Sequence, residues 1–411
     1  MSKTVAVIAT LDTKGWEAKY LKEKLEALGK RVIIIDTGMK TDPLGVKPTV
    51  THDMVAEAAG YSFAEISTLT RGIACEKMAK GVEAVVKRLF EEGRIDGVLA
   101  IGGLDGSLLA SAGMRTLPIG FPKLLVSAVA QGTTQFGDFV GIKDVIVMHS
   151  VTDILGLNTI TRKVFDEAAA AVSGMVDAEV STKLEGGKTI AATMLGNTTP
   201  AVMRAKALLE ERGFEVIAFH PNGTGGRAME ELIQQGFFTA VLDMTPHEVA
   251  AEHVFKEDDV YGGAGPTRLE GAGAMGIPQL VVPGCVDFII QGPIEKLPEK
   301  HRNRKRYYFT PTVTLVRASS EEMAAVGRVM AEKLNKARGP TAVAIPLRGF
   351  SMYNMEGKEM YDPEADAAFT AALKENLHPR IPVHMVDAHI NNPTFAETCA
   401  SILLDLIQSK A

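Results

Sequence analysis

The sequence predicts an α/β protein built from two tandem Rossmann-like, doubly wound domains with mainly parallel sheets. Short continuous apolar runs recur along the chain and are separated by segments with helical spacing, which is typical of parallel strands covered by helices on both faces. Glycine-rich turns follow several of these runs. The 411 residues also exceed what one core usually accommodates, which favours two domains of roughly 150 to 200 residues each.

In the first half, β-branched and apolar runs alternate with helical segments. After the first run, apolar residues recur at helical intervals from Trp16 to Leu28, and Gly29 then ends the pattern. The elements expected in chain order are a strand at 4–9, a helix at 14–28, a strand at 32–35, a helix at 74–92, strands at 98–101, 123–129 and 145–147, and a helix at 163–175. The polar, glycine-containing segment 177–188 predicts a boundary between a nucleotide-binding domain at 1–180 and a second domain at 188–411.

The same rhythm restarts after this boundary. Two helices are expected at 201–212 and 225–235, because Gly213 and Gly236 follow them. Strands are expected at 189–194, 215–219, 240–243, 279–282, 312–316, 341–345 and 383–386. In sheets of this kind, ligands bind beyond the carboxyl ends of the strands, where the glycine-rich turns fall.

Composition restricts the class of protein. A formal charge of −6 and a pI near 5.9 argue against nucleic acid or an anionic membrane as the main partner. The basic segment 301–306 fits a surface loop, or a phosphate contact across a dimer, better than an RNA site. Cys75, Cys285 and Cys399 are too few and too scattered for a disulfide framework or a zinc site. The chain starts directly with a strand and has no membrane-length apolar stretch, so a cytoplasmic location is expected.

The turn after residues 98–101 carries the clearest ligand signal. Gly102, Gly103 and Gly106 allow a ligand to approach the backbone, and a helix that begins near Ser107 directs its free N–H groups into the loop. Such a site favours an anion, most often a phosphate. No Lys-Ser or Lys-Thr pair follows the last glycine, so this is not a Walker A loop, and the spacing is not Gly-x-Gly-x-x-Gly either. A phosphate is therefore predicted, but the nucleotide is not identified.

Polar residues at other strand ends of the first half converge on the same edge. Lys14 and Arg71 are candidates for neutralising phosphate oxygens, and Thr13 and Thr37 for hydrogen bonds to ribose or phosphate. Asp12 or Asp105 are candidates for holding Mg²⁺. A Thr or Asp after a strand also often caps a helix, and a lone Arg at a helix start often lies on the surface. It is their convergence that favours a site.

The second half has its own candidates. Glycine-, asparagine- and arginine-rich turns after two strands predict a second small-molecule site that holds an anion or a carboxylate. The candidate residues are Asn197, Thr198, Asn222, Gly223, Thr224, Gly225 and Arg227.

Three residues are candidates for catalysis. Asp387 and His389 are two apart, so either is a potential base on one face of an extended segment. Cys285 is a potential nucleophile, although free cysteines are more often buried and inert. His247 and His253 are six apart and do not match the i, i+4 spacing of a helical metal-ligand pair, so no protein metal centre is predicted there.

Several ordered motifs resemble a known family. They are Ala9-Thr10-Leu11-Asp12-Thr13-Lys14, the turn Ile101-Gly102-Gly103-x-x-Gly106-Ser107, Leu117-Pro118-Ile119-Gly120-Phe121-Pro122-Lys123, and His149-Ser150-Val151-Thr152-Asp153-Ile154 with Gly174-Met175. Together they are similar to the family of ATP-binding N-terminal regions of the tomato mosaic virus resistance protein, which has stand-alone microbial members. The resemblance extends over nearly the whole chain and is densest over residues 5–176.

The resemblance implies two Rossmann-like subdomains, a homodimer, and ATP, with magnesium, bound in the first subdomain. The residues that would contact the nucleotide are Asp12, Thr13, Lys14, Thr37, Arg71, Gly102, Gly103, Leu104, Asp105, Gly106 and Ser107. One departure is Leu104-Asp105, where another small residue is expected. Asp105 is therefore expected to point away from the phosphates or to be compensated by magnesium or Lys14. A TIM-barrel-like domain follows this region in the plant protein, which suggests a separately encoded partner here.

These observations favour an ATP-binding protein of small-molecule metabolism, with the nucleotide in the first domain and a small anionic ligand in the second. An ATP-dependent transfer or ligation would suit that arrangement, but fold alone does not supply the reaction. One alternative is a regulatory or interaction module that binds ATP without turnover. Another is a hydrolase or lyase that uses Asp387 and His389.

Overall fold

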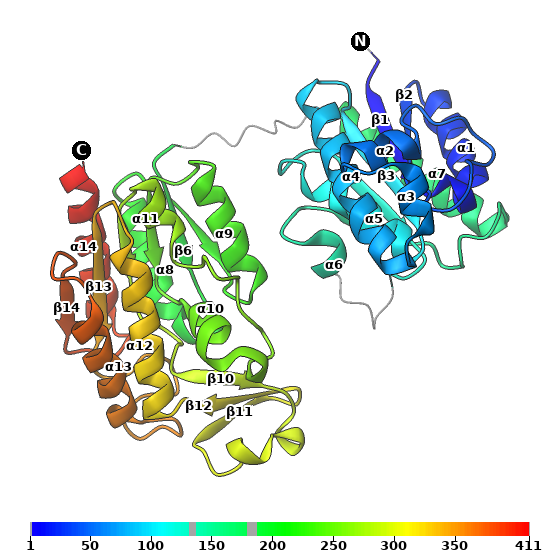
Figure 1. Ribbon diagram of the computed structural model, residues 1–411. Helices are drawn as coiled ribbons and strands as arrows, with labels where there is room; N and C mark the ends of the chain where they lie inside the picture. The colour runs from blue at the N-terminus through cyan, green and yellow to red at the C-terminus, as the bar shows by residue number, and fades with distance from the viewer. Residues whose placement is uncertain (1, 131–136, 179–186, 411) are drawn as a thin grey trace. The chain divides into compact units, whose positions relative to one another are not determined.

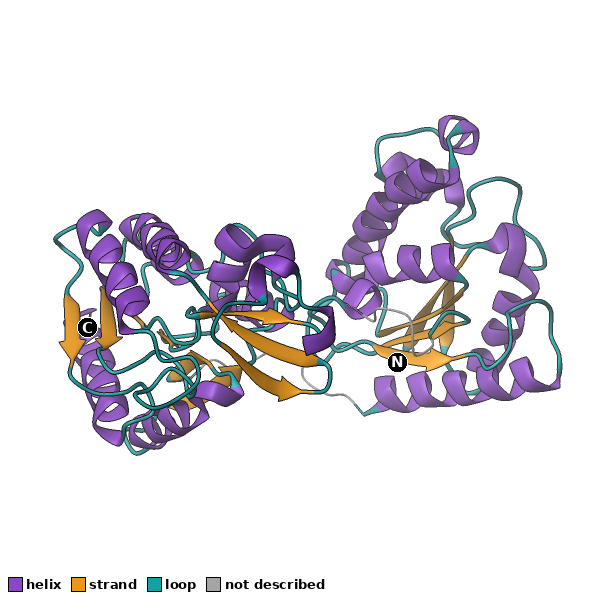
Figure 2. Cartoon of the chain, turned by 90° about the horizontal axis from the view of Figure 1, so that it is seen from below, coloured by secondary structure: helices purple, strands orange, loops and turns teal. Residues whose placement is uncertain are grey.

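The computed structural model describes residues 2–130, 137–178 and 187–410, and the chain divides into two compact units, Met1–Lys183 and Leu184–Ala411. Residues 179–186 of the segment predicted as a boundary lie outside the described residues. Each unit has a mainly parallel sheet flanked by helices, which confirms the predicted α/β fold class (Figures 1 and 2). None of the helices in the described part of the chain is long and apolar enough to cross a membrane.

The first unit is a five-stranded parallel sheet in the order β2-β1-β3-β4-β5. Its strands are β1 (Thr4–Ala9), β2 (Arg31–Asp36), β3 (Gly97–Gly102), β4 (Lys123–Ser127) and β5 (Ile146–His149). Its helices are α1 (Leu11–Ala27), α2 (His52–Ala58), α3 (Phe63–Thr68), α4 (Arg71–Glu91), α5 (Leu104–Arg115), α6 (Gly137–Val140) and α7 (Thr159–Asp177). Every strand predicted in this half is present, whereas α2, α3 and α6 were not predicted.

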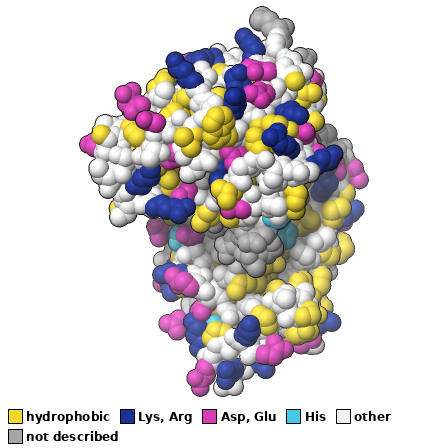
Figure 3. Space-filling model, turned by 90° about the vertical axis from the view of Figure 1, so that its right-hand side faces the viewer, with side chains coloured by type: hydrophobic (Ala, Val, Ile, Leu, Met, Phe, Trp, Pro, Cys, Tyr) yellow, Lys and Arg dark blue, Asp and Glu magenta, His cyan; other side chains and the backbone are white. Residues whose placement is uncertain are grey.

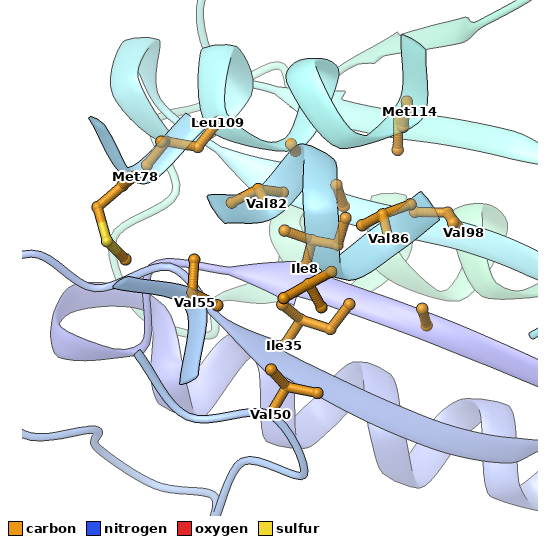
Figure 4. Packing of buried hydrophobic residues seen from close by; sticks show 14 of the residues in the cluster. Ile8, Ile35, Val50, Val55, Met78, Val82, Val86, Val98, Leu109 and Met114 are labelled. Atoms are coloured by element: carbon orange, nitrogen blue, oxygen red, sulfur yellow. The ribbon is translucent and has the colours of Figure 1, made fainter. Parts of the chain in front are cut away.

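Helices cover both faces of this sheet. On one face, Met78, Val82 and Val86 recur every four residues along α4 and so form one apolar stripe. Figure 4 shows this stripe packed with Ile8 of β1 and Ile35 of β2 in one buried cluster. A second buried cluster joins the opposite face to α1 and α7. This packing holds the carboxyl ends of β1 and β3 in fixed positions.

The second unit has a six-stranded parallel sheet in the order β14-β13-β9-β8-β6-β7 and a three-stranded antiparallel sheet in the order β10-β12-β11. Its strands are β6 (Thr189–Thr193), β7 (Glu215–Phe219), β8 (Ala240–Asp243), β9 (Gln279–Val281), β10 (Phe288–Gln291), β11 (Arg306–Thr310), β12 (Val313–Arg317), β13 (Thr341–Pro346) and β14 (Val383–Val386). Its longer helices are α8 (Thr199–Glu210), α9 (Thr224–Gln234), α12 (Ser320–Asn335), α13 (Pro363–Asn376) and α14 (Pro393–Lys410), and the short α10 (His247–Ala250) and α11 (Gly271–Met275) lie between them in the chain.

One predicted strand has a different partner from the one expected. The run 312–316 is a strand, β12, but it pairs antiparallel with β10 and β11, so the expectation that it continues the parallel series is wrong. Strand direction depends on which segments lie side by side, and an apolar run does not encode it. The basic segment expected as a surface loop leads directly into β11, which begins at Arg306.

Both parallel sheets change direction at their first strand. The chain runs from β1 outward to β2 and then returns to add β3 on the other side, and β6, β7 and β8 repeat this pattern. A crevice therefore opens between the carboxyl ends of the two strands that flank the reversal. In doubly wound sheets this switch point is the usual place for a ligand.

Candidate functional site

A cavity of about 430 Å³ lies at the switch point of the first unit, beyond the carboxyl ends of β1 and β3. Its lining residues follow β1, β2 and β3 or begin α4. They are Thr10, Asp12, Thr13, Lys14, Met39, Lys40, Arg71, Gly103, Leu104, Asp105 and Gly106. The structure thus brings most of the predicted nucleotide residues together, whereas Thr37, Gly102 and Ser107 are not part of the lining.

The N-terminus of α5 opens on this cavity. The helix starts directly after β3, and its N-cap residue is Gly103, which has no side chain to cap the helix. The first amide of the helix that finds an acceptor is that of Ser107, which donates to the carbonyl of Gly103 at 2.9 Å. Among the described residues, the N–H groups of Leu104, Asp105 and Gly106 have no hydrogen-bond acceptor. They carry the positive end of the helix dipole and are suited to bind an anion.

The glycines of this turn have different roles. A Cβ atom at Gly102 would lie 2.6 Å from the backbone of Gly106, so Gly102 is required for the strand to pack on the helix. A Cβ atom at Gly103 would meet no protein atom within 4 Å, so this glycine leaves space beside the cavity. Ser107 is buried and hydrogen-bonds to the hydroxyl of Ser127 at 2.7 Å. Ser107 therefore supports the turn and is not placed to contact a ligand.

Three cationic side chains line the cavity, and Lys14 is the least engaged. Lys14 has non-helical backbone angles (φ −123°, ψ 20°) that form a kink within α1. Among the described residues, no carboxylate lies within ion-pair distance of its ammonium group. Lys40, by contrast, donates to the carbonyls of Ser67 at 2.9 Å and Leu69 at 3.0 Å. Lys14 is thus the cation that is free to meet a phosphate.

The third cation, Arg71, is paired with Asp105. Their side chains form an ion pair between the first turns of α4 and α5, which raises the pKa of the Arg71 guanidinium. Asp105 was expected to point away from the phosphates or to be compensated by magnesium or Lys14. Instead, Asp105 lines the cavity, and Arg71 compensates its charge. The Arg71 side chain is 73% exposed and that of Asp105 19%, so solvent reaches this pair.

The remaining polar residues of the first unit mainly build the loops. Asp12 accepts the N–H groups of Met39 at 3.1 Å and Lys40 at 3.3 Å, which holds the segment after β2 against α1. Thr13 donates to the carbonyl of Thr10 at 3.3 Å. Thr37 is buried, and its hydroxyl has no hydrogen-bond partner among the described residues.

A buried pair below the cavity was not predicted. Asp36, the last residue of β2, accepts the N–H groups of Leu11 and Gly38, and its other carboxylate oxygen contacts Nδ1 of His52 at 3.0 Å. Burial raises the pKa of Asp36. The signal in the sequence is an acidic residue at the end of an otherwise apolar strand. The pair ties the starts of α1 and α2 to the end of β2.

The predicted anion site of the second unit is filled by the protein itself. The N–H groups of Gly223 and Gly226, at the start of α9, donate to Oε1 of Glu248 at 2.7 and 3.0 Å. Glu248 is fully buried and pairs with Nε of Arg268 at 2.8 Å. The Asn222 side chain accepts from Thr224 and Gly225 within the same turn. Arg227 donates to the carbonyl of Gly223. These groups therefore form an internal structure and are not open to an added anion.

The other two candidate substrate-binding residues, Thr198 and Asn197, have different positions. The Thr198 hydroxyl is buried and bonds to that of Thr245 at 2.8 Å, so Thr198 ties the turn after β6 to the turn after β8. Asn197 lines a second cavity.

The candidate catalytic residues do not form a catalytic arrangement. Asp387 is exposed and pairs with Arg348 through two hydrogen bonds of 2.8 and 3.0 Å, which lower the pKa of the carboxyl group. His389 donates from Nε2 to the carbonyl of Ser351 at 2.9 Å and accepts the N–H of Asn391 at Nδ1, so both ring nitrogens are used. Burial also lowers the pKa of His389.

Cys285, the candidate nucleophile, is fully buried, and this raises the pKa of its thiol. A thiol must ionise to act as a nucleophile, so this position does not favour that role. Among the described residues, no group of three or more His, Cys, Asp or Glu side chains is placed to hold a metal ion.

Comparisons with known proteins cover nearly the whole chain. Residues 3–181 match the model of the N-terminal domain of an uncharacterised protein family, UPF0261, and residues 187–407 match the model of its C-terminal domain. A UPF0261 protein from Clostridium tetani is 42% identical over 99% of this chain and 100% of its own length. The ToMV resistance protein Tm-1(GCR237) of Solanum lycopersicum is 32% identical over 98% of this chain, which covers 56% of the tomato protein.

Proposed function

The chain belongs to the uncharacterised protein family UPF0261, and from this premise we propose that it binds ATP with Mg²⁺ in the cavity beyond β1 and β3. The observation that carries the proposal is the open N-terminus of α5. Three unpartnered N–H groups, those of Leu104, Asp105 and Gly106, face a cavity that Lys14 also lines. Donors of this kind at a helix N-terminus, together with a lysine, suit phosphate oxygens. The family resemblance described above supplies ATP as the nucleotide.

The ion pair between Arg71 and Asp105 suggests how the site responds to the nucleotide. A phosphate competes with Asp105 for Arg71, because both are anions and Arg71 is solvent-exposed. Mg²⁺ that accompanies ATP keeps several water ligands and usually takes one or two carboxylates. Asp105, once released by Arg71, is the acidic side chain best placed to face such an ion. Asp12 is less available because two backbone N–H groups already bond to it.

The geometry supports binding of ATP better than its turnover. Asp12 is held by two backbone N–H groups, and Asp105 pairs with Arg71 or, once released, faces Mg²⁺, so neither carboxylate is free to act as a base. A regulatory or interaction module thus fits as well as an ATP-dependent transferase or ligase. The hydrolase or lyase alternative has no support in the positions of Asp387 and His389. The small anionic ligand is not proposed at the α9 turn, because Glu248 occupies it.

The remaining expectations concern partners and location. A homodimer, a separately encoded TIM-barrel-like partner and a cytoplasmic location stay predictions. The absence of a nucleic-acid partner also stays a prediction. Figure 3 shows acidic and basic side chains interspersed over the face that it presents. A nucleic-acid site usually concentrates Lys and Arg in one area.

Thermal unfolding with and without ATP and Mg²⁺ tests the proposal. Trp16 is the single tryptophan and lies on α1, so its fluorescence reports the first unit alone. A ligand at about 100 times its dissociation constant adds about 2.7 kcal/mol to the free energy of unfolding. We expect a clear upward shift of the midpoint in the wild type and a much smaller one in Lys14→Ala. The matched control is Lys87→Ala on the far part of α4, and it should shift like the wild type.

Equal shifts in Lys14→Ala and the wild type would contradict the proposed site, and no shift in either would contradict ATP binding. Phosphate release measured in the same samples separates an ATPase from a binding module.

A further inference from the structure

A second cavity, of about 200 Å³, lies within the second unit at the carboxyl ends of β6 and β7. Its lining residues come from the turns after β6 and β7, from the segment before residue 265, and from the antiparallel sheet. They are Leu195, Gly196, Asn197, His220, Tyr261, Phe288, Ile290, Phe309, Val313 and Leu315. We propose that this cavity binds a neutral small molecule that has a flat apolar body and one hydrogen-bonding group. This goes beyond the proposed nucleotide site and does not depend on it.

The antiparallel sheet builds the apolar wall. Phe288 and Ile290 are two apart on β10, and Val313 and Leu315 are two apart on β12, so each pair lies on one face of its strand. Ile290 and Leu315 are direct partners in the ladder. Phe288, Ile290 and Leu315 are at most 3% exposed and form the closed part of the cavity. One face of the added sheet thus faces the carboxyl edge of the parallel sheet.

Aromatic side chains form the more open part. Tyr261 is 36% exposed and Phe309 is 44% exposed, and the His220 ring lies beside Tyr261 with centroids 6.5 Å apart. Together with Phe288, four of the ten lining residues carry rings. Rings offer flat faces on which another flat group stacks. The shape of the ligand body follows from this lining.

The most buried polar side chain of the cavity, that of Asn197, lacks a partner. Asn197 is only 7% exposed, and among the described residues its side-chain amide makes no hydrogen bond. Its backbone carbonyl, by contrast, accepts from Nδ2 of Asn391 at 2.8 Å, so the main chain at this position is anchored. The amide is not one of the fully enclosed polar groups of the described residues, so it is reachable from the cavity and has free donors and a free acceptor. A ligand with a carbonyl, amide or hydroxyl group would satisfy it.

The charge of the ligand follows from the same residues. The lining contains no Lys, Arg, Asp or Glu, in contrast to the cavity of the first unit. A charged group buried here would lose its hydration without gaining a Lys, Arg, Asp or Glu side chain as counter-ion. The ligand is therefore neutral, which differs from the small anion predicted from the sequence for this unit.

The cavity is also preformed. Asp259 accepts the N–H of Tyr261 at 3.0 Å, and its other oxygen contacts Nε2 of His247 at 2.9 Å. Both Asp259 and His247 are buried, so their contacts hold the backbone at Tyr261 in place. A preformed wall reduces the entropy lost when a ligand binds.

Benzamide and benzoate test the proposal, because they share a flat body and differ in charge. The readout is ¹³C-methyl NMR of Ile290 and Leu315 in the full chain without nucleotide. A ligand of the size of benzamide should bind with a dissociation constant of about 1 to 10 mM. We expect saturable shifts with benzamide and an affinity for benzoate that is weaker by about tenfold or more.

Asn197→Leu should weaken the binding of benzamide by about tenfold, since leucine removes the hydrogen bond and keeps the volume of the side chain. Asn303→Leu is the matched control, because Asn303 is exposed and lies outside the cavity, and it should bind like the wild type. If Asn197→Leu fails to fold, Val313→Phe fills the cavity instead and should abolish the shifts. The proposal would be overturned if benzoate bound more tightly than benzamide, or if benzamide did not shift these methyl groups. It would also be overturned if the variant that folds bound benzamide with unchanged affinity.

Discussion

Arg71, the first residue of α4, forms an ion pair with Asp105 in the first turn of α5. The two helix N-termini meet at the proposed nucleotide site, and the Asp105 carboxylate lies where an anion is favoured. The second unit has a related arrangement at α9, where Glu248 bonds to the first N–H groups. Glu248 is fully buried, whereas the Arg71 side chain is largely exposed. An external anion can therefore compete in the first unit but not in the second.

Replacing Asp105 with Asn should tighten the binding of ATP in the absence of Mg²⁺. The change removes a negative charge near the phosphates and releases Arg71, which should raise the affinity by about three- to tenfold. Titration of ATP followed by Trp16 fluorescence, with and without Mg²⁺, measures this. Asp405→Asn, in the other unit, is the control and should have no effect. Weaker binding of metal-free ATP to Asp105→Asn would show that Asp105 does not compete with the nucleotide.

Replacing Glu248 with Ala should destabilise the second unit by about 3 kcal/mol or more. The variant leaves the N–H groups of Gly223 and Gly226 without an acceptor and removes one counter-charge from the buried Arg268. Urea unfolding followed by circular dichroism measures the loss, with the exposed Glu211→Ala as control.

Formate should restore part of the stability that Glu248→Ala loses, because it is a small carboxylate that fits the vacated position. Equal response of the variant and the wild type to formate would contradict the assignment of the α9 turn as an anion position.

Asp366 should make the stability of the second unit depend on pH. Burial raises the pKa of Asp366 from 3.8 to about 6, although Arg317 and Asn354 bond to the carboxylate. The folded state binds this proton more tightly than the unfolded chain, so the contribution is largest below pH 3.8 and is lost as the pH rises through about 6.

The size of this effect is about 3 kcal/mol. The free energy of unfolding of the wild type, minus that of Asp366→Asn, should therefore fall by about this amount between acidic and neutral pH. Urea unfolding at several pH values measures the difference. A difference that is constant or rises with pH would contradict the raised pKa.

The sequence predicts what is local in this fold. Most of the strands, α4, α8 and α9, and the glycine turn before α5 follow from hydrophobic periodicity and from Gly102 and Gly103, which act over a few residues, whereas β10 and β11 were not predicted. These signals also placed Lys14 and Arg71 at one sheet edge. The convergence on one cavity was predictable because parallel strands end on the same side.

Contacts between distant residues were not predictable in this way. Arg71 and Asp105 are 34 residues apart, and Gly226 and Glu248 are 22 apart. Whether a helix N-terminus is open or filled depends on such a partner, and the glycine turns of α5 and α9 look alike without it. The antiparallel sheet was not predictable for the same reason, since the direction of β12 depends on the strands beside it.

Calorimetric titration of ATP and Mg²⁺ into the wild type and Gly103→Ala tests the central claim most directly. The added methyl group meets no protein atom within 4 Å and φ is negative (−79°), so the methyl group itself clashes with no part of the fold. In the proposed site it crowds the phosphates, which should weaken binding by about tenfold. Gly174→Ala, on α7, is the matched control with equally open surroundings. We predict binding in the wild type and the control and a clear loss in Gly103→Ala, whereas equal affinity in all three would contradict ATP binding at the α5 N-terminus.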